Sequence, residues 1–277
     1  MPELPEMQAL SERLSATFAG LSLTGLDLKQ FSALKTVEPS PDQLLGRALE
    51  GVGRRGKYLL FRFGSVRLVL HLSQGGRVDV EDPPKTTKPK GSVARLRFED
   101  GPSLLIKEFG TERKAALWVL DEDDRGPFEN LGPEPTSNAF EELIREGTDG
   151  RRLHTMLRDQ RTVAGIGRGF SDDILHAAMI SPFDSLKSLT KEQRGLLLDA
   201  TSEVLAHATD KERERTGGLP VKLKGRFTVH GRFGEPCPRC YNELRRVSYE
   251  SHEIVYCPLC QTGGKVLADR RLSRLIR

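Results

Sequence analysis

The sequence predicts a protein of the α+β class, with an N-terminal two-layer antiparallel β-sandwich, a helical domain and a C-terminal β-hairpin module. Apolar residues alternate with polar ones and are interrupted by turn signals over residues 20–120, which is typical of strands. Apolar residues recur at helical spacing over residues 137–208. An acidic and then proline-rich segment, residues 121–136, separates the two patterns and indicates a domain boundary.

These patterns divide the chain into three predicted domains, residues 1–130, 131–220 and 221–277. A length of 277 residues allows about two domains of ordinary size, and the last segment is a short module. Charged residues make up 30% of the chain and hydrophobic residues 37%, which favours a soluble protein with modest cores. Because no stretch suits a membrane span and no signal peptide opens the sequence, we expect a cytoplasmic protein with reduced thiols.

The first six residues carry the most distinctive chemistry. Pro2 is small enough for Met1 to be removed, so the mature chain would begin with a secondary amine. An α-amino group titrates near ~7.7–8.0, so a useful fraction is a neutral nucleophile at cellular pH. Attack on an aldehyde carbon would give an iminium, which is an electron sink, and Glu3 and Glu6 lie within reach for proton transfer. The alternative is a frayed, solvated terminus.

A helix is predicted directly behind this terminus. Pro5 suits a first helical turn, where its missing N–H costs nothing. An apolar stripe at helical spacing follows, formed by Met7, Leu10, Leu14 and Phe18. We therefore expect a docked helix start, whose partial positive charge suits a nearby phosphate or carboxylate.

Two hairpins and a closing strand make up most of the predicted sandwich. Turn signals at Gly64-Ser65 and at residues 99–102 each separate two apolar runs. The predicted strands are a short first run at 21–28, then 58–63, 66–72, 92–98, 103–107 and 116–120. Lys57 lies in a basic turn before one of these strands, where an ordinary charged turn is the simplest interpretation.

Three glycines, Gly165, Gly167 and Gly169, alternate between two predicted helices, in a stretch that also contains Arg161 and Arg168. The glycines do not follow a strand of a βαβ unit, so a dinucleotide-binding loop is a weak interpretation. Glycines allow close backbone approach, and the N–H groups of the next helix can face a phosphate. The stretch is therefore a candidate phosphate-binding turn.

Four cysteines form two C-x-x-C pairs, Cys237 with Cys240 and Cys257 with Cys260. Sixteen residues separate the pairs, a spacing typical of a tetrahedral structural zinc site. Four thiolates leave no open coordination position, so one Zn²⁺ here would be structural and not catalytic. Two disulfides or four unrelated thiols are the alternatives.

Basic residues concentrate around these cysteines. Residues 221–277 contain 12 Lys or Arg and 5 Asp or Glu, a net charge of +7, so the other 220 residues sum to −3. Zinc on four thiolates would lower that +7 to about +5. A basic module favours a polyanionic partner, although solvated surface charge gives the same composition.

Motifs along the whole chain resemble those of the formamidopyrimidine-DNA glycosylase and endonuclease VIII family, and the Pro-Glu-Leu-Pro-Glu start resembles its formamidopyrimidine branch. The Gly-Lys-Tyr around Lys57, the segment Leu131–Pro135 and the glycine stretch followed by Ser171–Leu175 are similar to the family's motifs, the last to its helix–two-turn–helix. The resemblance implies a bifunctional DNA glycosylase and abasic-site lyase of base excision repair. Such an enzyme would act as a monomer on damaged or abasic double-stranded DNA in the bacterial cytoplasm and nucleoid.

The resemblance also implies roles for individual residues. Pro2 would attack C1′ of an extruded nucleotide, Glu3 would transfer protons at the sugar, and Glu6 would position the terminus. Lys57 would contact the phosphate beside the lesion. The implied DNA-binding residues are Gln74, Arg161, Gly167, Arg168 and His252.

Two of these residues depart from the family's pattern at phosphate contacts. Arg168 stands where the family usually has asparagine, so a phosphate would be held with a longer reach and a different geometry. His252 stands where the family usually has arginine, and histidine is only partly charged at neutral pH.

A third departure concerns the residues that fill the hole left by the flipped base. Gln74 occupies the position of a methionine that follows a His-Leu-x pattern. Residues 107–113 lack the arginine–phenylalanine pair of the family, and Phe109 or Arg113 is the available substitute. The charged, glycine-rich residues 211–219 correspond to a loop that covers the extruded base, and we expect them to be short and mobile.

Two other functions remain open at the level of sequence. A non-catalytic DNA-binding protein would keep the fold, the zinc and the basic module, and the departures at Arg168 and His252 motivate it. A zinc-ribbon module for transcription or partner binding would explain residues 221–277 but not the N-terminus. The preferred lesion and the preferred opposite base do not follow from the sequence.

Overall fold

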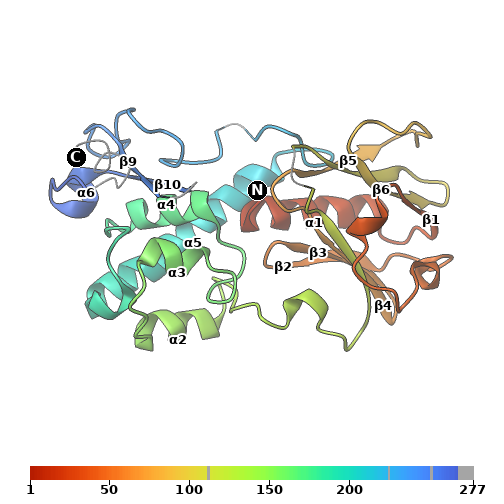
Figure 1. Cartoon of the computed structure of the whole chain (residues 1–277), viewed down its shortest axis with the longest axis horizontal. Helices are drawn as coiled ribbons and strands as arrows, with labels where there is room; N and C mark the ends of the chain where they lie inside the picture. Colours follow the sequence, from red (N-terminus) through yellow and green to blue (C-terminus); the bar gives the residue numbers. More distant parts are fainter. Residues whose placement is uncertain (111–112, 224, 250–251, 268–277) are drawn as a thin grey trace. The chain divides into compact units, whose positions relative to one another are not determined.

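The computed structural model describes residues 1–110, 113–223, 225–249 and 252–267 (Figure 1). The chain forms two compact units, residues 1–130 with 208–223, and residues 131–207 with those that follow 223. The mixed helix and sheet content confirms the predicted α+β class, whereas the three-domain division stays a prediction. None of the helices in the described part has the length and apolar character that crossing a bilayer requires.

The first helix, α1 (Leu4–Phe18), begins as the sequence predicts. Glu3 precedes the helix, and its backbone N–H donates to Glu6 Oε2 at 2.7 Å. This contact is the return half of a capping box, which satisfies a donor that a helix start otherwise leaves open. The predicted apolar stripe, from Met7 to Phe18, is fully buried in the core of the first unit.

Two four-stranded antiparallel sheets form the sandwich, with strand orders β1-β6-β7-β5 and β2-β3-β4-β8 (Figure 1). The strands are β1 (Leu23–Leu28), β2 (Gly51–Arg55), β3 (Tyr58–Phe63), β4 (Val66–His71), β5 (Gly76–Glu81), β6 (Ser92–Phe98), β7 (Ser103–Glu108) and β8 (Ala116–Asp121). Short 3₁₀ turns lie at Phe31–Ala33, Pro41–Leu44 and Gly126–Phe128. Strands β2 and β5 have no counterpart in the prediction, because their short glycine- and arginine-containing runs look like turns in isolation.

The second unit contains the predicted helices and the hairpin. Its elements are α2 (Asn138–Glu146), α3 (Leu153–Arg158), α4 (Arg168–Ala177), the 3₁₀ turn Leu186–Ser188, α5 (Lys191–Arg213), β9 (Arg245–Tyr249), β10 (His252–Tyr256) and α6 (Pro258–Thr262). Helix α5 begins two residues later and ends five residues later than the predicted helix at 189–208, and its part from residue 208 onward belongs to the first unit. The added turn is rich in Lys, Arg and Glu, which are good helix formers.

The segment after α5, expected to be mobile, is packed against the first unit instead. Arg13 on α1 donates to the carbonyls of Glu212 at 2.8 Å and Gly217 at 3.0 Å. Leu219 is fully buried, and its N–H donates to the carbonyl of Val78 on β5 at 2.7 Å. The predicted mobility of residues 211–219 was wrong, because Arg13 donates hydrogen bonds to the backbone carbonyls of Gly217 and Gly218. The composition of the segment itself does not reveal this distant partner.

Candidate functional site

The N-terminal residues are buried, which excludes the frayed terminus. Pro2 is buried, Glu3 is 4% exposed and Glu6 is fully buried. Because the backbone of Glu3 is bonded to the Glu6 carboxylate, the two carboxylates are held at the first turn of α1, directly behind Pro2. The arrangement places two proton-transfer groups around the chain terminus.

Lys57 is brought toward this helix start by the course of β2. Ser15 Oγ accepts from the N–H of Val52 at 3.2 Å, and Gln8 Oε1 accepts from Arg54 Nε at 2.9 Å. Strand β2 therefore runs along α1 from its end toward its beginning. Lys57 follows in the next turn and is only 4% exposed. The turn is therefore shorter than predicted: it contains Gly56 and Lys57, whereas Arg54 and Arg55 belong to strand β2.

His71, at the end of β4, lies beside Lys57, and no motif in the sequence predicted a role for it. Burial, together with the positive charge of Lys57, lowers the pKa of His71 to about 4. The ring also packs on Tyr58, with centroids 4.6 Å apart. At neutral pH His71 is therefore an uncharged hydrogen-bonding group next to a cation. Its position in the His-Leu run was the signal that could have revealed it.

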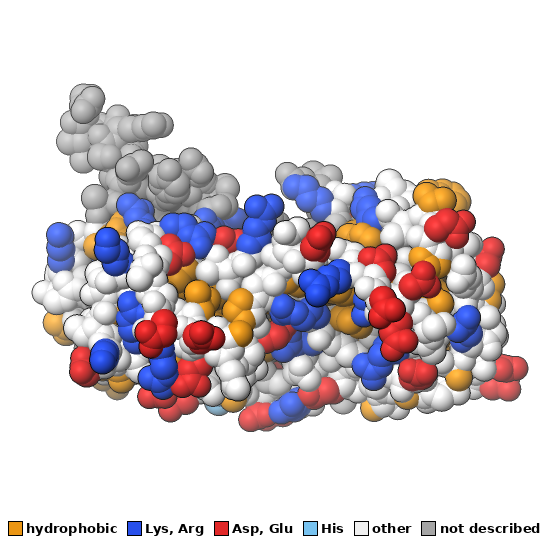
Figure 2. All heavy atoms as spheres, turned by 90° about the horizontal axis from the view of Figure 1, so that it is seen from below, with side chains coloured by type: hydrophobic (Ala, Val, Ile, Leu, Met, Phe, Trp, Pro, Cys, Tyr) orange, Lys and Arg blue, Asp and Glu red, His pale blue; other side chains and the backbone are white. Residues whose placement is uncertain are grey.

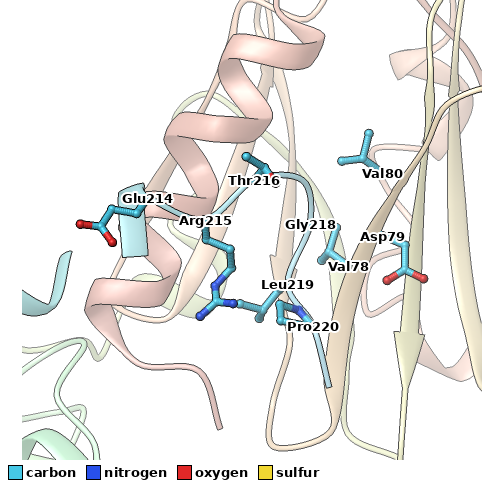
Figure 3. A pocket seen from close by; sticks show the side chains of 9 residues that line it. All are labelled: Val78, Asp79, Val80, Glu214, Arg215, Thr216, Gly218, Leu219 and Pro220. Atoms are coloured by element: carbon cyan, nitrogen blue, oxygen red, sulfur yellow. The ribbon is translucent and has the colours of Figure 1, made fainter. Parts of the chain in front are cut away.

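A pocket of about 600 Å³ lies between β5 and the segment that follows α5 (Figure 3). Its lining residues are Val78, Asp79, Val80, Glu214, Arg215, Thr216, Gly218, Leu219 and Pro220. Arg215 donates twice to the buried carboxylate of Glu212, at 2.9 and 3.1 Å. These bonds raise the pKa of Arg215, and the negative charge of Glu6 adds to the effect. Glu212 therefore holds in this pocket a cation to which the sequence assigned no role.

A second pocket, of about 430 Å³, brings together the two loops expected to fill the hole left by a flipped base. Gln74 lies in the loop between β4 and β5, and Phe109 follows β7. The N–H of Phe109 donates to the carbonyl of Gly75 at 3.0 Å, and a Cβ at Gly75 would lie 1.9 Å from the Phe109 carbonyl oxygen. Only glycine permits this approach.

Of the two substitutes that the sequence offered, Phe109 lies with Gln74 in this pocket and Arg113 does not line it. Phe109 is 39% exposed. The Glu108 carboxylate accepts from the backbone N–H groups of Lys114 and Ala115 at 2.7 and 2.9 Å, which closes the loop behind Phe109. Residues 111 and 112 lie outside the described part of the chain.

The glycine stretch forms a structured turn in front of α4. The Gln160 side chain donates to the carbonyl of Ile166 at 2.6 Å and accepts from the N–H of Gly165 at 2.9 Å. Gly167 precedes the helix and Arg168 is its first residue. Burial is the main cause that lowers the pKa of Arg158, and the positive charge of Arg168 is the second. The two guanidinium groups therefore lie close enough to repel each other. Arg161 is exposed beside this turn.

The four cysteines converge as their spacing predicts. Their sulfur atoms all lie within 4.8 Å of one another, with 3.4 Å between Cys240 and Cys257 and 4.0 Å between Cys237 and Cys260. A disulfide bond measures about 2.05 Å, so these thiols are free and suit one shared metal ion. The backbone N–H of Asn242 is the main cause that lowers the pKa of Cys240 to about 7, whereas burial raises the pKa values of Cys257 and Cys260. A bound metal ion would hold all four as thiolates.

Helix α4 is hydrogen-bonded to the segment that contains the cysteines at two places. The Asp173 carboxylate accepts from the N–H groups of Thr228, Val229 and His230, at 2.7 to 3.1 Å. At the other end of α4, Arg239 donates to the carbonyl of His176 at 2.9 Å. The His176 ring lies 3.2 Å from Cys237 Sγ. These contacts link the candidate phosphate-binding turn to the cysteine cluster through one helix.

His252 opens β10 and pairs with Tyr249 across the β9–β10 hairpin. Its side chain lies outside the described part of the structure. On the face of the molecule in Figure 2, basic and acidic side chains are interspersed, so this view shows no surface of a single sign.

Two protein-family models match the chain. The formamidopyrimidine-DNA glycosylase N-terminal domain matches residues 1–111, and the formamidopyrimidine-DNA glycosylase H2TH domain matches residues 131–217. The formamidopyrimidine-DNA glycosylase of Thermus thermophilus is 32% identical over 95% of this chain and all of its own length. An uncharacterized formamidopyrimidine-DNA glycosylase-like protein of Mycobacterium tuberculosis is 42% identical over 53% of this chain and 94% of its own.

Solved structures agree with these matches. A Lactococcus lactis formamidopyrimidine-DNA glycosylase, non-covalently bound to DNA with an abasic site, superposes with a TM-score of 0.82 at 26% identity, covering 94% of this chain and 99% of that one. The MutM protein of Thermus thermophilus superposes with a TM-score of 0.80 at 31% identity, covering 96% and 100%. These matches define the class as DNA glycosylases. The chain belongs to the formamidopyrimidine-DNA glycosylase family, which confirms the resemblance.

Proposed function

We propose that the protein is a bifunctional DNA glycosylase and abasic-site lyase that uses the amine of Pro2, after loss of Met1, as its nucleophile. The observation that carries this proposal is the buried start of α1, where Pro2 is followed by Glu3 and Glu6, with Lys57 in a neighbouring turn. A solvated terminus would not need two buried carboxylates behind a proline. Family membership adds independent support.

The chemistry follows from a secondary amine beside acids. The Pro2 nitrogen forms a bond to C1′ of the nucleotide while the bond from C1′ to the damaged base breaks; the nitrogen then gives up its proton, and the departing base takes up a proton. Ring opening of the sugar, with Glu3 as proton donor, leaves an iminium at C1′. The iminium withdraws electrons, so a base can remove the C2′ proton and the 3′ phosphate leaves by elimination. Because C1′ lies inside the duplex, the nucleotide has to be extruded first.

DNA binding would use groups from both units. We assign phosphate contacts to Lys57, Arg161, Arg168 and His252, and to the backbone N–H groups at Gly167 that open α4. Arg168 extends further than an asparagine would and can bind a phosphate with two donors. Gln74 and Phe109 would enter the space left by the extruded nucleotide. The aromatic ring can stack on a base, and the amide can bond to an orphaned one.

The four cysteines would hold one Zn²⁺ in a closed tetrahedral site. Sulfur-only coordination fits their chemistry and their convergence, and leaves no position for substrate. The ion would stabilise the β9–β10 hairpin and would take no part in the reaction.

A non-catalytic DNA-binding protein with this fold is the alternative, which the departures at Arg168 and His252 favour. Borohydride trapping on abasic-site DNA separates the two functions, because only an enzyme that forms an iminium becomes covalently attached. We expect a trapped complex that depends on a free Pro2 amine. DNA binding without trapping under any buffer condition would favour the alternative.

A further inference from the structure

The loop between β4 and β5 presents an exposed side chain on a fixed backbone. Gln74 is exposed, whereas the backbone carbonyls of residues 74–76 all accept hydrogen bonds. The N–H of Phe109 donates to the carbonyl of Gly75, and Arg77 Nη1 donates to those of Gln74 at 3.2 Å and Gly76 at 2.5 Å. Because any movement of the loop breaks several of these bonds, the point from which the Gln74 side chain projects is fixed.

The same guanidinium is bonded to a second segment of the chain. Arg77 Nε and Nη2 both donate to the carbonyl of Val221, at 3.3 and 3.0 Å. Val221 follows Leu219, which is fully buried and donates its N–H to the carbonyl of Val78 on β5 (Figure 3). Arg77 therefore joins the Gln74 loop to the segment after α5, within one compact unit.

This bridge requires the shape of a guanidinium. Arginine carries five N–H groups in a rigid planar fork, whereas the ammonium of lysine is a point donor. All three side-chain nitrogens of Arg77 donate to backbone carbonyls of this chain. The fork is therefore directed at the two segments that it joins, unlike an arginine that extends into solvent toward a phosphate.

We propose that Arg77 is a positioning residue of the DNA-binding site: it holds the Gln74 loop ready for insertion into the duplex and ties that loop to the segment after α5. This inference rests on the proposed function, in which Gln74 and Phe109 enter the space left by the extruded nucleotide. A loop that has to be ordered during binding costs free energy, which reduces what insertion can return against unstacking. Arg77 orders the loop beforehand and contacts no DNA in this role.

The first test measures insertion without chemistry. 2-Aminopurine is placed opposite a tetrahydrofuran analogue of an abasic site, which has no base to expel and no aldehyde, and its fluorescence rises when the orphaned base is unstacked. At saturating protein, Arg77→Met should reduce this rise roughly twofold or more, because the loop is no longer held. Arg77→Lys keeps the charge but cannot span both segments, so its rise should be reduced as well, and it replaces Arg77→Met if that variant does not fold.

Arg97→Met is the matched control, because Arg97 lies on β6 of the same sheet and pairs at the surface with Asp27. Its fluorescence rise should equal that of wild type. A full rise in Arg77→Lys would show that charge alone is sufficient, and an equal reduction in Arg97→Met would show a general effect on the sheet. Either result overturns the role of Arg77. A log–log slope of affinity against salt that is smaller by about one in Arg77→Met would make Arg77 a phosphate contact and would also overturn it.

A double-mutant cycle then separates positioning from general destabilisation. Single-turnover excision of 8-oxoguanine paired with cytosine is compared for wild type, Gln74→Ala, Arg77→Met and the double variant, at a temperature at which thermal unfolding shows that all four are folded. If Arg77 acts through Gln74, each single change slows excision several-fold, and the double variant is no slower than the slower single one. Effects that multiply, or a Gln74→Ala rate equal to wild type, contradict the proposal. A wild type that neither excises nor traps overturns the proposed function, whereas the fluorescence comparison still decides the role of Arg77.

Discussion

At the scale of single residues, the proposed mechanism requires the Pro2 amine to stay neutral next to two buried carboxylates, Glu3 and Glu6. Negative charge favours the ammonium form and so opposes nucleophilic attack. The start of α1 works in the other direction, because its partial positive charge disfavours a cation. Lys57, which is buried in the neighbouring turn, adds positive charge near the same helix start. The balance of these groups sets the fraction of amine that can react at neutral pH.

Catalysis should depend on a free secondary amine at Pro2. An extension of one or more residues before Pro2 turns the amine into an amide, which has no nucleophilic lone pair, so trapping and nicking of abasic DNA should both be abolished. Pro2→Gly leaves a primary amine and should retain part of the trapping. Mass spectrometry first establishes which residue begins each protein, and borohydride trapping on abasic DNA then measures how much of it forms the iminium. Nicking by the extended protein at the native rate would refute the Pro2 mechanism.

His71 should make folding stability depend on pH between about 7 and 5. Its pKa is lowered from 6.5 to about 4 in the folded state, so the unfolded chain binds its proton first as the pH falls. Stability is fully present above the unfolded pKa and is lost as the pH decreases below it, by about 2 kcal/mol at pH 5.

Urea unfolding of wild type and His71→Gln at both pH values checks this. The variant lacks the titrating ring, so its stability should change less over the same interval. His207, an exposed histidine on α5, provides a matched control, because His207→Gln should keep the wild-type dependence. Equal pH dependence in wild type and His71→Gln would show that the ring is not held neutral.

Residues with local chemistry were predictable, and residues that act across the fold were not. Pro2, Glu3 and the cysteines have recognisable patterns, because the spacing along the chain is itself the signal. Arg215 sits in a run of alternating charges that resembles any solvated helix end. Both Arg213 and Arg215 pair with an acid three residues earlier, and what distinguishes Arg215 is that its partner, Glu212, is buried whereas Asp210 is exposed. That burial depends on the fold and not on the local sequence.

At the scale of elements, α4 connects the candidate phosphate-binding turn to the cysteine module. Its first residues follow the glycine turn, its middle binds the backbone of residues 228–230 through Asp173, and its last carbonyls accept from Arg239. The sequence predicted the helix and the metal site separately. The link between them was not predictable, because Asp173 and Arg239 each look like an ordinary charged surface residue.

Loss of the metal should therefore weaken DNA binding while leaving the chemical step largely intact. Cys257→Ser removes one of four ligands, and three ligands hold zinc poorly. We expect about one zinc per wild-type chain and none in the variant. Affinity for abasic DNA should fall severalfold, whereas the cleavage rate at saturating enzyme should stay close to wild type.

Metal analysis together with a titration of single-turnover rate against enzyme concentration measures both quantities. Cys257→Asp, which can still offer an oxygen ligand, provides a graded comparison. A wild type that contains no metal but binds DNA fully would refute the zinc assignment. A large loss of rate at saturation would place the module in the chemical step.

At the scale of the whole molecule, substrate range depends on what offsets the cost of extruding a nucleotide. Unstacking costs a few kcal/mol per base step, and inserted apolar side chains normally recover part of it. Here the two loops meet through the backbone contact between Gly75 and Phe109, so the aromatic contribution remains. The expected arginine is missing and Gln74 is polar, which weakens the contact with neighbouring bases.

We therefore predict efficient processing of abasic sites and comparatively slow excision of 8-oxoguanine paired with cytosine. An abasic site has no base to unstack, so weak contacts from the inserted side chains should slow its processing little. The pair of 8-oxoguanine with cytosine is intact, so its full unstacking and unpairing energy has to be supplied. Single-turnover rates on the two substrates at one salt concentration provide the comparison. Gln74→Met should raise the rate on the 8-oxoguanine pair several-fold and leave the abasic rate nearly unchanged, because the thioether restores apolar contact with the stack. Phe109→Ala should do the reverse and reduce excision of the paired lesion further. If the wild type excises the 8-oxoguanine pair as fast as it cleaves the abasic site, another residue fills the hole and Gln74 is not the weak point.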